Sequence, residues 1–507
     1  MSDHCHVDGA GIDHACSFHV KNEETINNAK RREKTINAFA RVRTRQELWS
    51  RRAPCTCETP YQHSLAAADG ERSRVRIRDG SRRRRDLAEW NPRICRGVQG
   101  DALPDAECET KDSIPLLEAC LERLRDKNTS SDLQRTMRTA SNEPFVVNVK
   151  DEISGLEKDL AYLRAFHGLL INGTTFDAAL KSIELVQVLR PFHPKSEEMF
   201  DEEFAECRSF LKKFAETSKG DPELKPILVT DWDGTMKDYC SQYATNLQPI
   251  YSAISLARFA GEFTRLAAVL TAGPLRGPGI LDLTSLPING PLVFSGSWGR
   301  EWWLHGKRVV HNDGISEEGF DALERMNDQM RALLDEHPDF GQFALVGSGV
   351  QRKVDRLTLG VQTVCAHVNP DVSKSYMEAI RERMHRVDPN KKVLHFDAST
   401  ELEVEVVVRS EGGLWNKANG VARIVEAAGL SLGPPRTILI CGDTSSDLPM
   451  VRQAIASNAE NSMALFVGCS ETLKQSVRDL VGDDARCCFV GCPDVIHAAM
   501  TTLSNSL

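Results

Sequence analysis

The sequence predicts an α/β protein with a doubly wound parallel-sheet core and an inserted α/β cap domain, preceded by a helical bundle and a disordered basic N-terminal tail. Three observations support this prediction. After residue 222, short apolar runs alternate with helical stretches, as a parallel sheet covered by helices requires. Between residues 114 and 217, apolar residues recur at three- and four-residue steps, which is typical of amphipathic helices. The first 108 residues show neither pattern.

These patterns divide the chain into four regions. We expect the tail at 1–108, the helical bundle at 109–221, the α/β core at 222–299 and 409–507, and the cap at 300–408. The 507 residues are 41% hydrophobic and 27% charged, so the chain can bury cores of ordinary size.

Charge and composition exclude several classes of protein. The net charge of −9 argues against a dedicated nucleic-acid-binding protein, although residues 1–100 alone carry a net charge of +7. No run approaches the ~18 consecutive apolar residues of a membrane span, and the first 30 residues lack the apolar run of a secretory signal. We therefore expect a cytoplasmic protein without membrane contact, whose 15 cysteines are free thiols.

The N-terminal tail has too few apolar residues to offset the entropy lost on ordering. It contains arginine-dense runs that end in the tetrad Arg82–Arg85. We interpret this tetrad as part of a solvated tail, with a nuclear address or an RNA-contacting patch as the alternative. The early histidines and cysteines lack the paired spacing of a zinc site, so we do not expect zinc there.

The helical region begins near Ile114. Four amphipathic stretches, at 114–121, 153–166, 178–188 and 200–214, are expected to pack against one another in a small bundle. Because no polar cluster interrupts their apolar faces, we expect packing or binding of a protein partner rather than chemistry.

The core strands follow from continuous apolar runs, which indicate parallel strands buried on both faces. These runs lie at 226–230, 266–271, 292–294, 437–441 and 464–467. For the inserted cap we expect a hairpin around His305–Lys307, helices at 316–336 and 371–387, and strands at 342–347, 356–368, 392–397 and 401–408.

Two carboxylates follow directly after the first core strand. Asp231 and Asp233 stand at the carboxyl end of the run 227–229, where open α/β sheets bind their ligands. Asp231 can attack phosphorus as a nucleophile, and Asp233 can protonate the leaving alkoxide and then activate water. Gly234 permits a sharp turn near a phosphate group. A calcium loop is excluded because its sixth position requires glycine and here is Met236. A plain Asp-rich turn remains as the alternative.

A second acidic pair follows another core strand. Asp443 comes after the strand ending at Cys441, and Asp447 lies one turn later. Oxygen ligands from Asp231, Asp443 and one backbone carbonyl suit Mg²⁺, although such a cluster alone is more often a helix N-cap. Two further residues, Thr271 and Lys417, can contact phosphate through a hydroxyl and a positive charge, but each is ordinarily a strand-end cap or a surface residue.

In their order and setting, these residues resemble the four motifs of the haloacid dehalogenase superfamily, over about residues 225–507. The resemblance implies that Asp231 is the nucleophile and Asp233 the general acid/base. It also implies that Thr271 and Lys417 hold phosphate. The residues that it assigns to Mg²⁺ are Asp231, Asp233, Asp443 and Asp447.

Within that superfamily the chain is similar to the trehalose-6-phosphate phosphatases, whose G-x-x-G-x-E segment matches Gly296 to Glu301. Their E-V segment matches Glu403 or Glu405, and the helical region resembles that of the nematode branch. The usual S/T-G-R segment is Thr271-Ala-Gly-Pro-Leu-Arg276 in this chain, which departs from the family pattern. Candidate sugar-binding residues are Arg276, Arg300, Glu301, Gln351, Lys353, Arg356, His367, Glu403 and Glu405.

The resemblance implies Mg²⁺-dependent hydrolysis of trehalose 6-phosphate to trehalose and phosphate through an aspartyl-phosphate intermediate. The cap would select the sugar through buried hydrogen-bonding groups that the wrong sugar leaves unpaired. Two alternatives stay open: another sugar-phosphate phosphatase on the same scaffold, or a mainly scaffolding protein that acts through its helical bundle.

Overall fold

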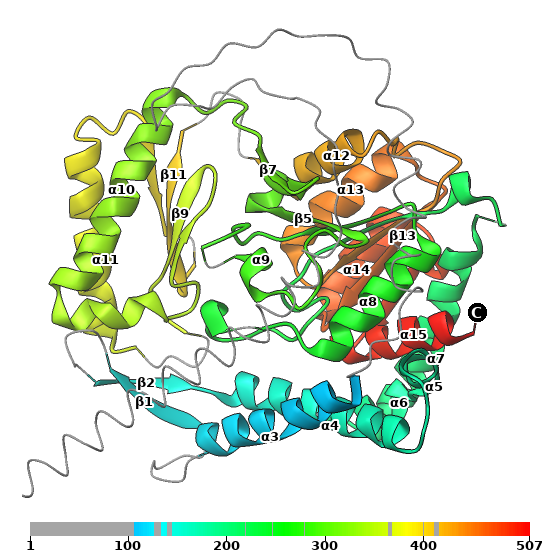
Figure 1. Cartoon of the computed structure of the whole chain (residues 1–507). Coiled ribbons are helices and arrows are strands. Elements are labelled where there is room, and N and C mark those ends of the chain that lie inside the picture. Colours follow the sequence, from blue (N-terminus) through cyan, green and yellow to red (C-terminus); the bar gives the residue numbers. More distant parts are fainter. Residues whose placement is uncertain are drawn as a thin grey trace, which may run out of the picture. The chain divides into compact units, whose positions relative to one another are not determined.

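The computed structural model describes residues 106–125, 133–138 and 144–506, apart from 219, 246, 278, 364–367, 399 and 410–414 (Figure 1). Almost all of the expected tail, 1–108 with Arg82–Arg85, therefore lies outside the described residues, as does His367. Helix α3 (Ala106–Leu124) opens the described chain, close to the boundary expected at residue 109.

The core is an eight-stranded sheet in the order β14-β13-β12-β3-β4-β5-β6-β7. Its strands are β3 (Ile227–Thr230), β4 (Leu266–Leu270), β5 (Leu292–Gly296), β6 (Glu301–Leu304), β7 (Lys307–Val310), β12 (Ile438–Gly442), β13 (Ser462–Val467) and β14 (Cys487–Val490). The strands from β14 to β5 run parallel. Every residue of β3, β4, β12 and β13 is buried, which explains why these strands appear in the sequence as continuous apolar runs.

Helices cover both faces of this sheet. One hydrophobic cluster joins the sheet to α12 (Lys417–Ala427), α13 (Leu448–Ser457) and α14 (Glu471–Val481). A second cluster joins the opposite face to α8 (Ile250–Phe263) and α15 (Pro493–Asn505), and the short helix α9 (Ile280–Leu283) follows β4. The predicted doubly wound α/β fold is thereby confirmed.

The hairpin β6–β7 differs from the prediction. The sequence predicts that it belongs to the cap at 300–408, but β6 pairs antiparallel with β5 and extends the core sheet. Alternating strand patterns specify which residues form a hairpin but not which sheet edge it joins.

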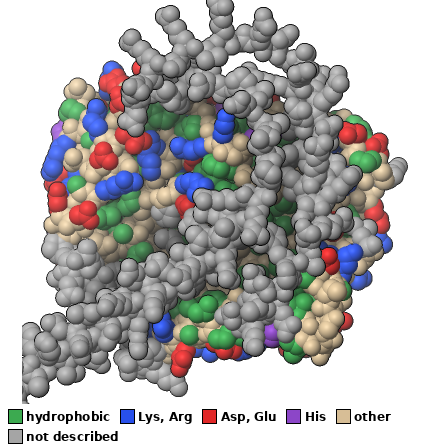
Figure 2. Space-filling model, viewed as in Figure 1, with side chains coloured by type: hydrophobic (Ala, Val, Ile, Leu, Met, Phe, Trp, Pro, Cys, Tyr) green, Lys and Arg blue, Asp and Glu red, His purple; other side chains and the backbone are tan. Residues whose placement is uncertain are grey.

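As far as it is described, the inserted domain comprises a four-stranded antiparallel sheet and two long helices. Its strands, in the order β10-β11-β9-β8, are β10 (Leu394–Asp397), β11 (Glu403–Val408), β9 (Arg356–Gly360) and β8 (Val350–Arg352). Helices α10 (Glu317–Glu336) and α11 (Pro370–Val387) pack against each other and share a hydrophobic cluster with this sheet (Figure 1). Acidic and basic side chains are interspersed on the outer face of this domain (Figure 2). The strand expected at 342–347 is wrong, because its first half belongs to the 3-10 helix Pro338–Ala344 and the rest forms no strand.

In its described residues, the helical region contains four further α-helices and one hairpin. The helices are α4 (Lys150–Ile171), α5 (Phe176–Ser182), α6 (Leu185–Leu189) and α7 (Glu197–Glu216). The hairpin of β1 (Gln134–Arg138) and β2 (Pro144–Asn148) was not predicted. The helix expected at 178–188 is divided in two because Ile183 has an extended backbone. Rather than packing only among themselves, α6 and α7 lie against α15, and α4 lies against α8. Among the described helices, none combines the length and the apolar character needed to cross a membrane.

Candidate active site

The residues predicted to carry chemistry meet at one edge of the core sheet. Asp231 follows β3, Thr271 follows β4 and Asp443 follows β12, and these three strands are neighbours that run parallel. The carboxyl ends of parallel strands share one edge, so the three residues converge although they are far apart in the sequence. The backbone N–H of Asp231 donates to the carbonyl of Cys441 at 2.9 Å, which extends the β3–β12 pairing to the site.

Gly234 allows Asp443 to approach the turn after Asp231. Gly234 has a φ of +81°, in the left-handed region that glycine adopts without strain. A Cβ atom at this position would lie 2.1 Å from Oδ2 of Asp443, closer than any side chain can approach. Both the turn and the position of Asp443 therefore require glycine here.

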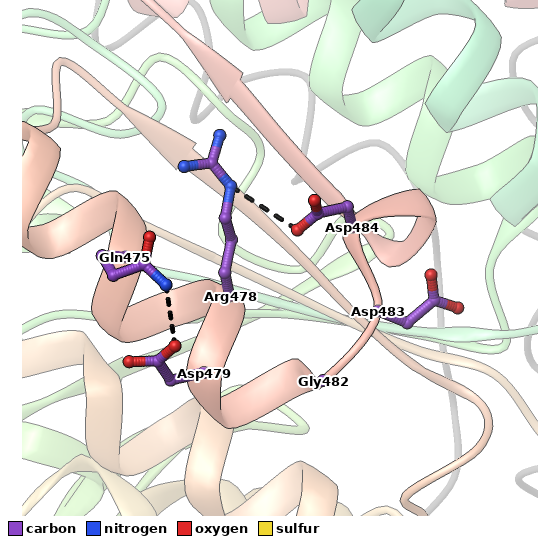
Figure 3. Close-up of a pocket in the computed structure, with 6 residues that line it drawn as sticks. All are labelled: Gln475, Arg478, Asp479, Gly482, Asp483 and Asp484. Carbon is purple, nitrogen blue, oxygen red and sulfur yellow. Dashed lines mark hydrogen bonds and ion pairs between the residues drawn. The ribbon is translucent and has the colours of Figure 1, made fainter.

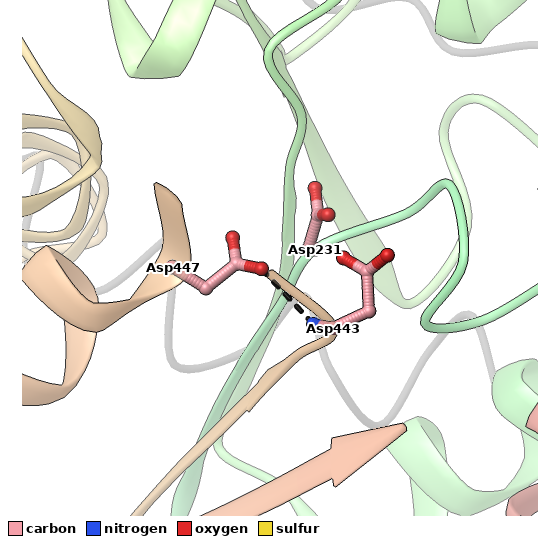
Figure 4. Close-up of side chains that lie close together, drawn as sticks. All are labelled: Asp231, Asp443 and Asp447. Atoms are coloured by element: carbon pink, nitrogen blue, oxygen red, sulfur yellow. Dashed lines mark hydrogen bonds between the residues drawn. The ribbon is translucent and has the colours of Figure 1, made fainter. Parts of the chain in front are cut away.

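Asp231, Asp443 and Asp447 form a compact group of carboxylates (Figure 4). Each offers an oxygen within 4.8 Å of the others, and Asp231 and Asp447 are buried. Burial raises the pKa of Asp231 to about 7. The positive charge of Lys417 opposes this rise, and the negative charge of Asp447 adds to it. Burial also raises the pKa of Asp443 to about 9, with further contributions from Asp231 and Asp447. A hard divalent cation would offset this repulsion and accept these oxygen ligands, so the group fits Mg²⁺.

The two oxygens of Asp447 already accept hydrogen bonds within the protein. Its Oδ1 lies 2.5 Å from Nζ of Lys417, and its Oδ2 accepts from the backbone N–H groups of Asp443 at 3.0 Å and Thr444 at 3.1 Å. Asp447 thus fixes the backbone that carries Asp443 and also orients Lys417. Asp231 and Asp443 keep more of their oxygens available for a cation.

Lys417, the first residue of α12, places a positive charge between two carboxylates. Its Nζ lies 2.8 Å from Oδ1 of Asp231, and the side chain is almost completely buried. Burial alone would lower the pKa of Lys417, but the charges of Asp231 and Asp447 raise it above its usual value. Lys417 is therefore a permanent cation beside Asp231.

The side chain of Asp233 lies outside the group of three carboxylates. Its Oδ1 forms an ion pair with Nζ of Lys237 on the same turn, at 2.7 Å. The backbone N–H of Gly234 donates to the carbonyl of Lys237 at 2.9 Å. Lys237 was not predicted from the sequence, because it lies on a turn, where four-residue spacing from an acidic residue carries no structural signal.

Thr271 is buried at the end of β4. Its Oγ1 accepts from the backbone N–H of Gly273 at 3.1 Å, and its carbonyl accepts from Trp298 at 3.1 Å. The hydroxyl proton is therefore available to an anion near Asp231.

Several predicted sugar-binding residues of the inserted domain gather around Trp298 of the core. The guanidinium of Arg356 lies 3.8 Å from the centre of the Trp298 ring, and Nζ of Lys353 lies 4.8 Å from it. Glu405 accepts from Arg356 at 2.8 Å and lies 3.8 Å from Lys353. Burial lowers the pKa of Lys353, while Glu405 opposes the shift. Trp298 has a φ of +52° and was not selected from the sequence, where only its neighbours matched a motif.

Gln351 and Glu403 belong to the same sheet of the inserted domain. Gln351 is buried in β8, and Oε2 of Glu403 accepts from the hydroxyl of Ser348 at 2.5 Å. Gln351 lies on β8, which leads directly to Lys353, and Glu403 lies on β11 together with Glu405. Both strands pair with β9, which carries Arg356.

Glu301 and Arg300 bind partners within the protein. Oε1 of Glu301 accepts from the backbone N–H of Leu275 at 2.9 Å and from the hydroxyl of Ser297 at 2.7 Å, and Oε2 accepts from Arg308 at 2.7 Å. Nε of Arg300 lies 3.2 Å from Asp355. These contacts fix the loop after Thr271 and the junction with the inserted domain.

Arg276, the third arginine of the predicted set, is 46% exposed and pairs with Asp282 at 3.3 Å. Its guanidinium also lies 5.2 Å from the centre of the Trp303 ring. It thus lies on the surface of the loop that follows Thr271.

A surface depression of about 580 Å³ lies at the end of α14 (Figure 3). Arg478 pairs there with Asp484 at 3.6 Å, and Gln475 donates to Asp479 at 2.8 Å. Since α14 starts after the carboxyl end of β13 and leads to the amino end of β14, this depression is at the opposite edge of the sheet from Asp231.

Comparisons with known proteins find similar sequences over most of the chain. Residues 228–496 match the family model described as "Trehalose-6-phosphate phosphatase, C-terminal", and residues 105–172 match "Trehalose-6-phosphate phosphatase N-terminal helical bundle domain". A trehalose-phosphatase of Brugia malayi is 56% identical over 398 residues, which cover 78% of this chain and 80% of that protein. A trehalose-phosphatase of Caenorhabditis elegans is 50% identical over 393 residues, which cover 77% of this chain and 88% of that protein.

Proposed function

The chain belongs to the trehalose-6-phosphate phosphatase family, and we propose that it hydrolyses trehalose 6-phosphate through an aspartyl-phosphate formed on Asp231. The chain is a phosphatase, a hydrolase of trehalose metabolism, as its relatives at 50–56% identity are. The observation that carries the proposed mechanism is the position of Asp231, which is buried at the strand end, 2.8 Å from Lys417 and beside Asp443.

The reaction proceeds in two transfers. A carboxylate oxygen of Asp231 attacks phosphorus, the bond from phosphorus to the sugar oxygen breaks, and Asp233 gives its proton to the departing alkoxide. Water then attacks the acyl phosphate while Asp233 accepts a proton from it, which releases phosphate and restores Asp231. Lys417 and the hydroxyl of Thr271 stabilise the charge on the transferring phosphoryl group.

We assign a divalent cation, Mg²⁺, to Asp231 and Asp443, with Asp233 contributing through its backbone and Asp447 orienting the others. When bound, the cation neutralises charge on the carboxylates and on the phosphate. The three close oxygens and the raised pKa values of Asp231 and Asp443 support this assignment.

We further propose that the sugar is recognised around Trp298 by Lys353, Arg356 and Glu405. Trehalose offers hydroxyls and little charge, so discrimination depends on buried polar groups that lose their partners when the wrong sugar binds. Gln351 and Glu403 extend this polar surface along the sheet of the inserted domain, whereas Arg276, Arg300 and Glu301 maintain its junction with the core.

We also propose a cytoplasmic location. Eight cysteines among the described residues are free thiols, which is typical of proteins in reducing compartments. A protein partner of the helical region stays a prediction. The apolar faces of α6 and α7 are covered by α15, while α3 leaves Leu116 50% exposed.

The test is phosphate release from trehalose 6-phosphate compared with sucrose, glucose and mannose phosphates, with Mg²⁺ and with EDTA. We expect a clear preference for trehalose 6-phosphate and loss of turnover in EDTA. Equal rates on all substrates would overturn the trehalose preference and favour a general sugar-phosphate phosphatase. Asp231→Asn should abolish turnover. A cell in which this variant still supplies the full physiological role would instead favour the scaffolding alternative.

A further inference from the structure

The segment that follows the catalytic aspartates, residues 237–245, is here named the motif loop. Through this loop, the turn that carries Asp233 contacts the helical region, which lies outside the catalytic core. Helix α4 of the helical region directs acidic and basic side chains onto this loop, and the inserted domain contacts it as well.

Lys158 of α4 is the most buried of these side chains, with 4% of its surface exposed. Its Nζ contacts Oδ2 of Asp238 in the motif loop and lies 2.7 Å from Oδ2 of Asp494 in α15. The other oxygen of Asp494 accepts from the hydroxyl of Tyr251 at 2.6 Å. One ammonium therefore links the helical region, the motif loop and the core. Placing a charge there is costly unless partners of opposite charge hold it, as they do here.

Other polar contacts join α4 and its preceding strand to the same loop. Oδ2 of Asp151 accepts from both the backbone N–H and the hydroxyl of Ser241, at 3.0 and 3.1 Å. The side-chain amide of Gln242 donates to the carbonyl of Asn148 at 2.9 Å. These bonds fix the backbone of the loop as well as its side chains.

The loop in turn fixes Asp233. Asp238 follows Lys237, whose buried Nζ lies 2.7 Å from Oδ1 of Asp233 and whose carbonyl accepts from Gly234. A displacement of Asp238 would move the backbone of Lys237, and with it the cation that holds the carboxylate of Asp233.

The far end of the loop is attached to the inserted domain. The backbone N–H of Tyr243 donates to the carbonyl of Gly347 at 2.9 Å, and Gln242 forms an isolated β-bridge with Gly347. The motif loop is thus held by α4 on one side and by the inserted domain on the other.

We propose that Lys158 is a positioning residue for Asp233, acting through Asp238 and Lys237, so that the helical region completes the proton-transfer geometry of the active site. This inference rests on the proposed role of Asp233 as general acid. In the first transfer, Asp233 gives its proton to the alkoxide oxygen as the bond from phosphorus to that oxygen breaks.

The first test is Asp238→Ala. The side chain of Asp238 is 42% exposed, and its removal leaves the pair of Lys158 and Asp494 intact, so no buried charge loses its last partner. Two substrates report on different needs: trehalose 6-phosphate leaves as an alkoxide that requires a proton, whereas 4-nitrophenyl phosphate leaves as a stable phenolate that does not. The second transfer, in which Asp233 accepts a proton from water, is common to both substrates, so the first transfer is compared through kcat/KM. We expect kcat/KM for trehalose 6-phosphate to fall about 10-fold to 100-fold, with kcat/KM for 4-nitrophenyl phosphate within about twofold of wild type.

Variants of Lys158 test the cation itself. Lys158→Met should reproduce the selective loss, and Lys158→Arg should recover much of it because the positive charge is restored. The matched control is Arg164→Met on the same helix, where Arg164 donates to Glu118 at 2.6 Å in an exposed pair away from the loop. This control should leave both substrates unchanged.

An unchanged ratio of the two kcat/KM values in Asp238→Ala would overturn the proposal. If both values fell equally together with a lowered Tm, the role of the contact would be purely structural. An incorrect substrate assignment can be told apart from an incorrect role of Lys158, because wild type would then release no phosphate from trehalose 6-phosphate. In that case the ratio is measured with any alkyl phosphate that wild type hydrolyses, and it decides the role of Lys158 equally well.

Discussion

Replacing Gly234 with alanine is expected to lower turnover about 100-fold by displacing Asp443. The added Cβ would lie 2.1 Å from Oδ2 of Asp443, whereas such contacts below 3.0 Å are essentially never found. The carboxylate must therefore move by about 1 Å, and a displacement of that size in a catalytic group lowers kcat by about 100-fold. The left-handed φ of +81° adds a stability loss of about 1–2 kcal/mol.

Gly173→Ala is the matched control for the backbone effect. Gly173 has a φ of +83° at the end of α4, and no heavy atom lies within 4 Å of the Cβ that alanine would add. Both variants should lose a similar free energy of unfolding in urea, but only Gly234→Ala should lose phosphate release from trehalose 6-phosphate. If the two variants kept kcat within about fivefold of each other, the close approach of Asp443 to the turn would not be needed for catalysis.

Two further predictions concern buried charges. Lys417→Met should abolish phosphate release and lower the free energy of unfolding in EDTA by about 3–5 kcal/mol, because Asp231 and Asp447 lose their cation. Turnover within about tenfold of wild type would contradict this. Burial lowers the pKa of His497 from 6.5 to about 4, so the unfolded chain gains a proton below pH 6.5 that the fold does not accept until about pH 4. Stability should therefore fall by about 3 kcal/mol as the pH decreases through this window, as measured by urea unfolding, and His497→Gln should remove that part of the slope.

The convergence of the catalytic residues could be predicted from the sequence because it follows from topology. Asp231, Thr271 and Asp443 each follow a continuous apolar run, and parallel strands bring such ends to one edge. The family resemblance inferred from these motifs is confirmed by matches over residues 228–496 and 105–172. The roles of the individual side chains stay predictions.

What could not be predicted depends on contacts between distant segments. The contact of Lys158 with Asp238 joins residues 80 positions apart, and neither residue stands out by spacing or motif. Trp298 approaches Arg356 only because the inserted domain returns to the core. An amphipathic pattern shows that one face of a helix is buried, but it does not show which element covers that face.

The helical region is integral to the packing of the core, and α15 provides the clearest indication. A helix that covers one face of a doubly wound sheet normally leaves its outer side in water, yet every residue of α15 except Thr502 and Asn505 is buried. Its outer side is covered by α6 and α7. Its sequence contains one charged residue, Asp494, which pairs with Lys158 of α4. A helix with a single charged residue and no side open to water must be enclosed by protein. The charge-poor run at 493–505 is therefore a sequence signal for the third layer that the helical region supplies.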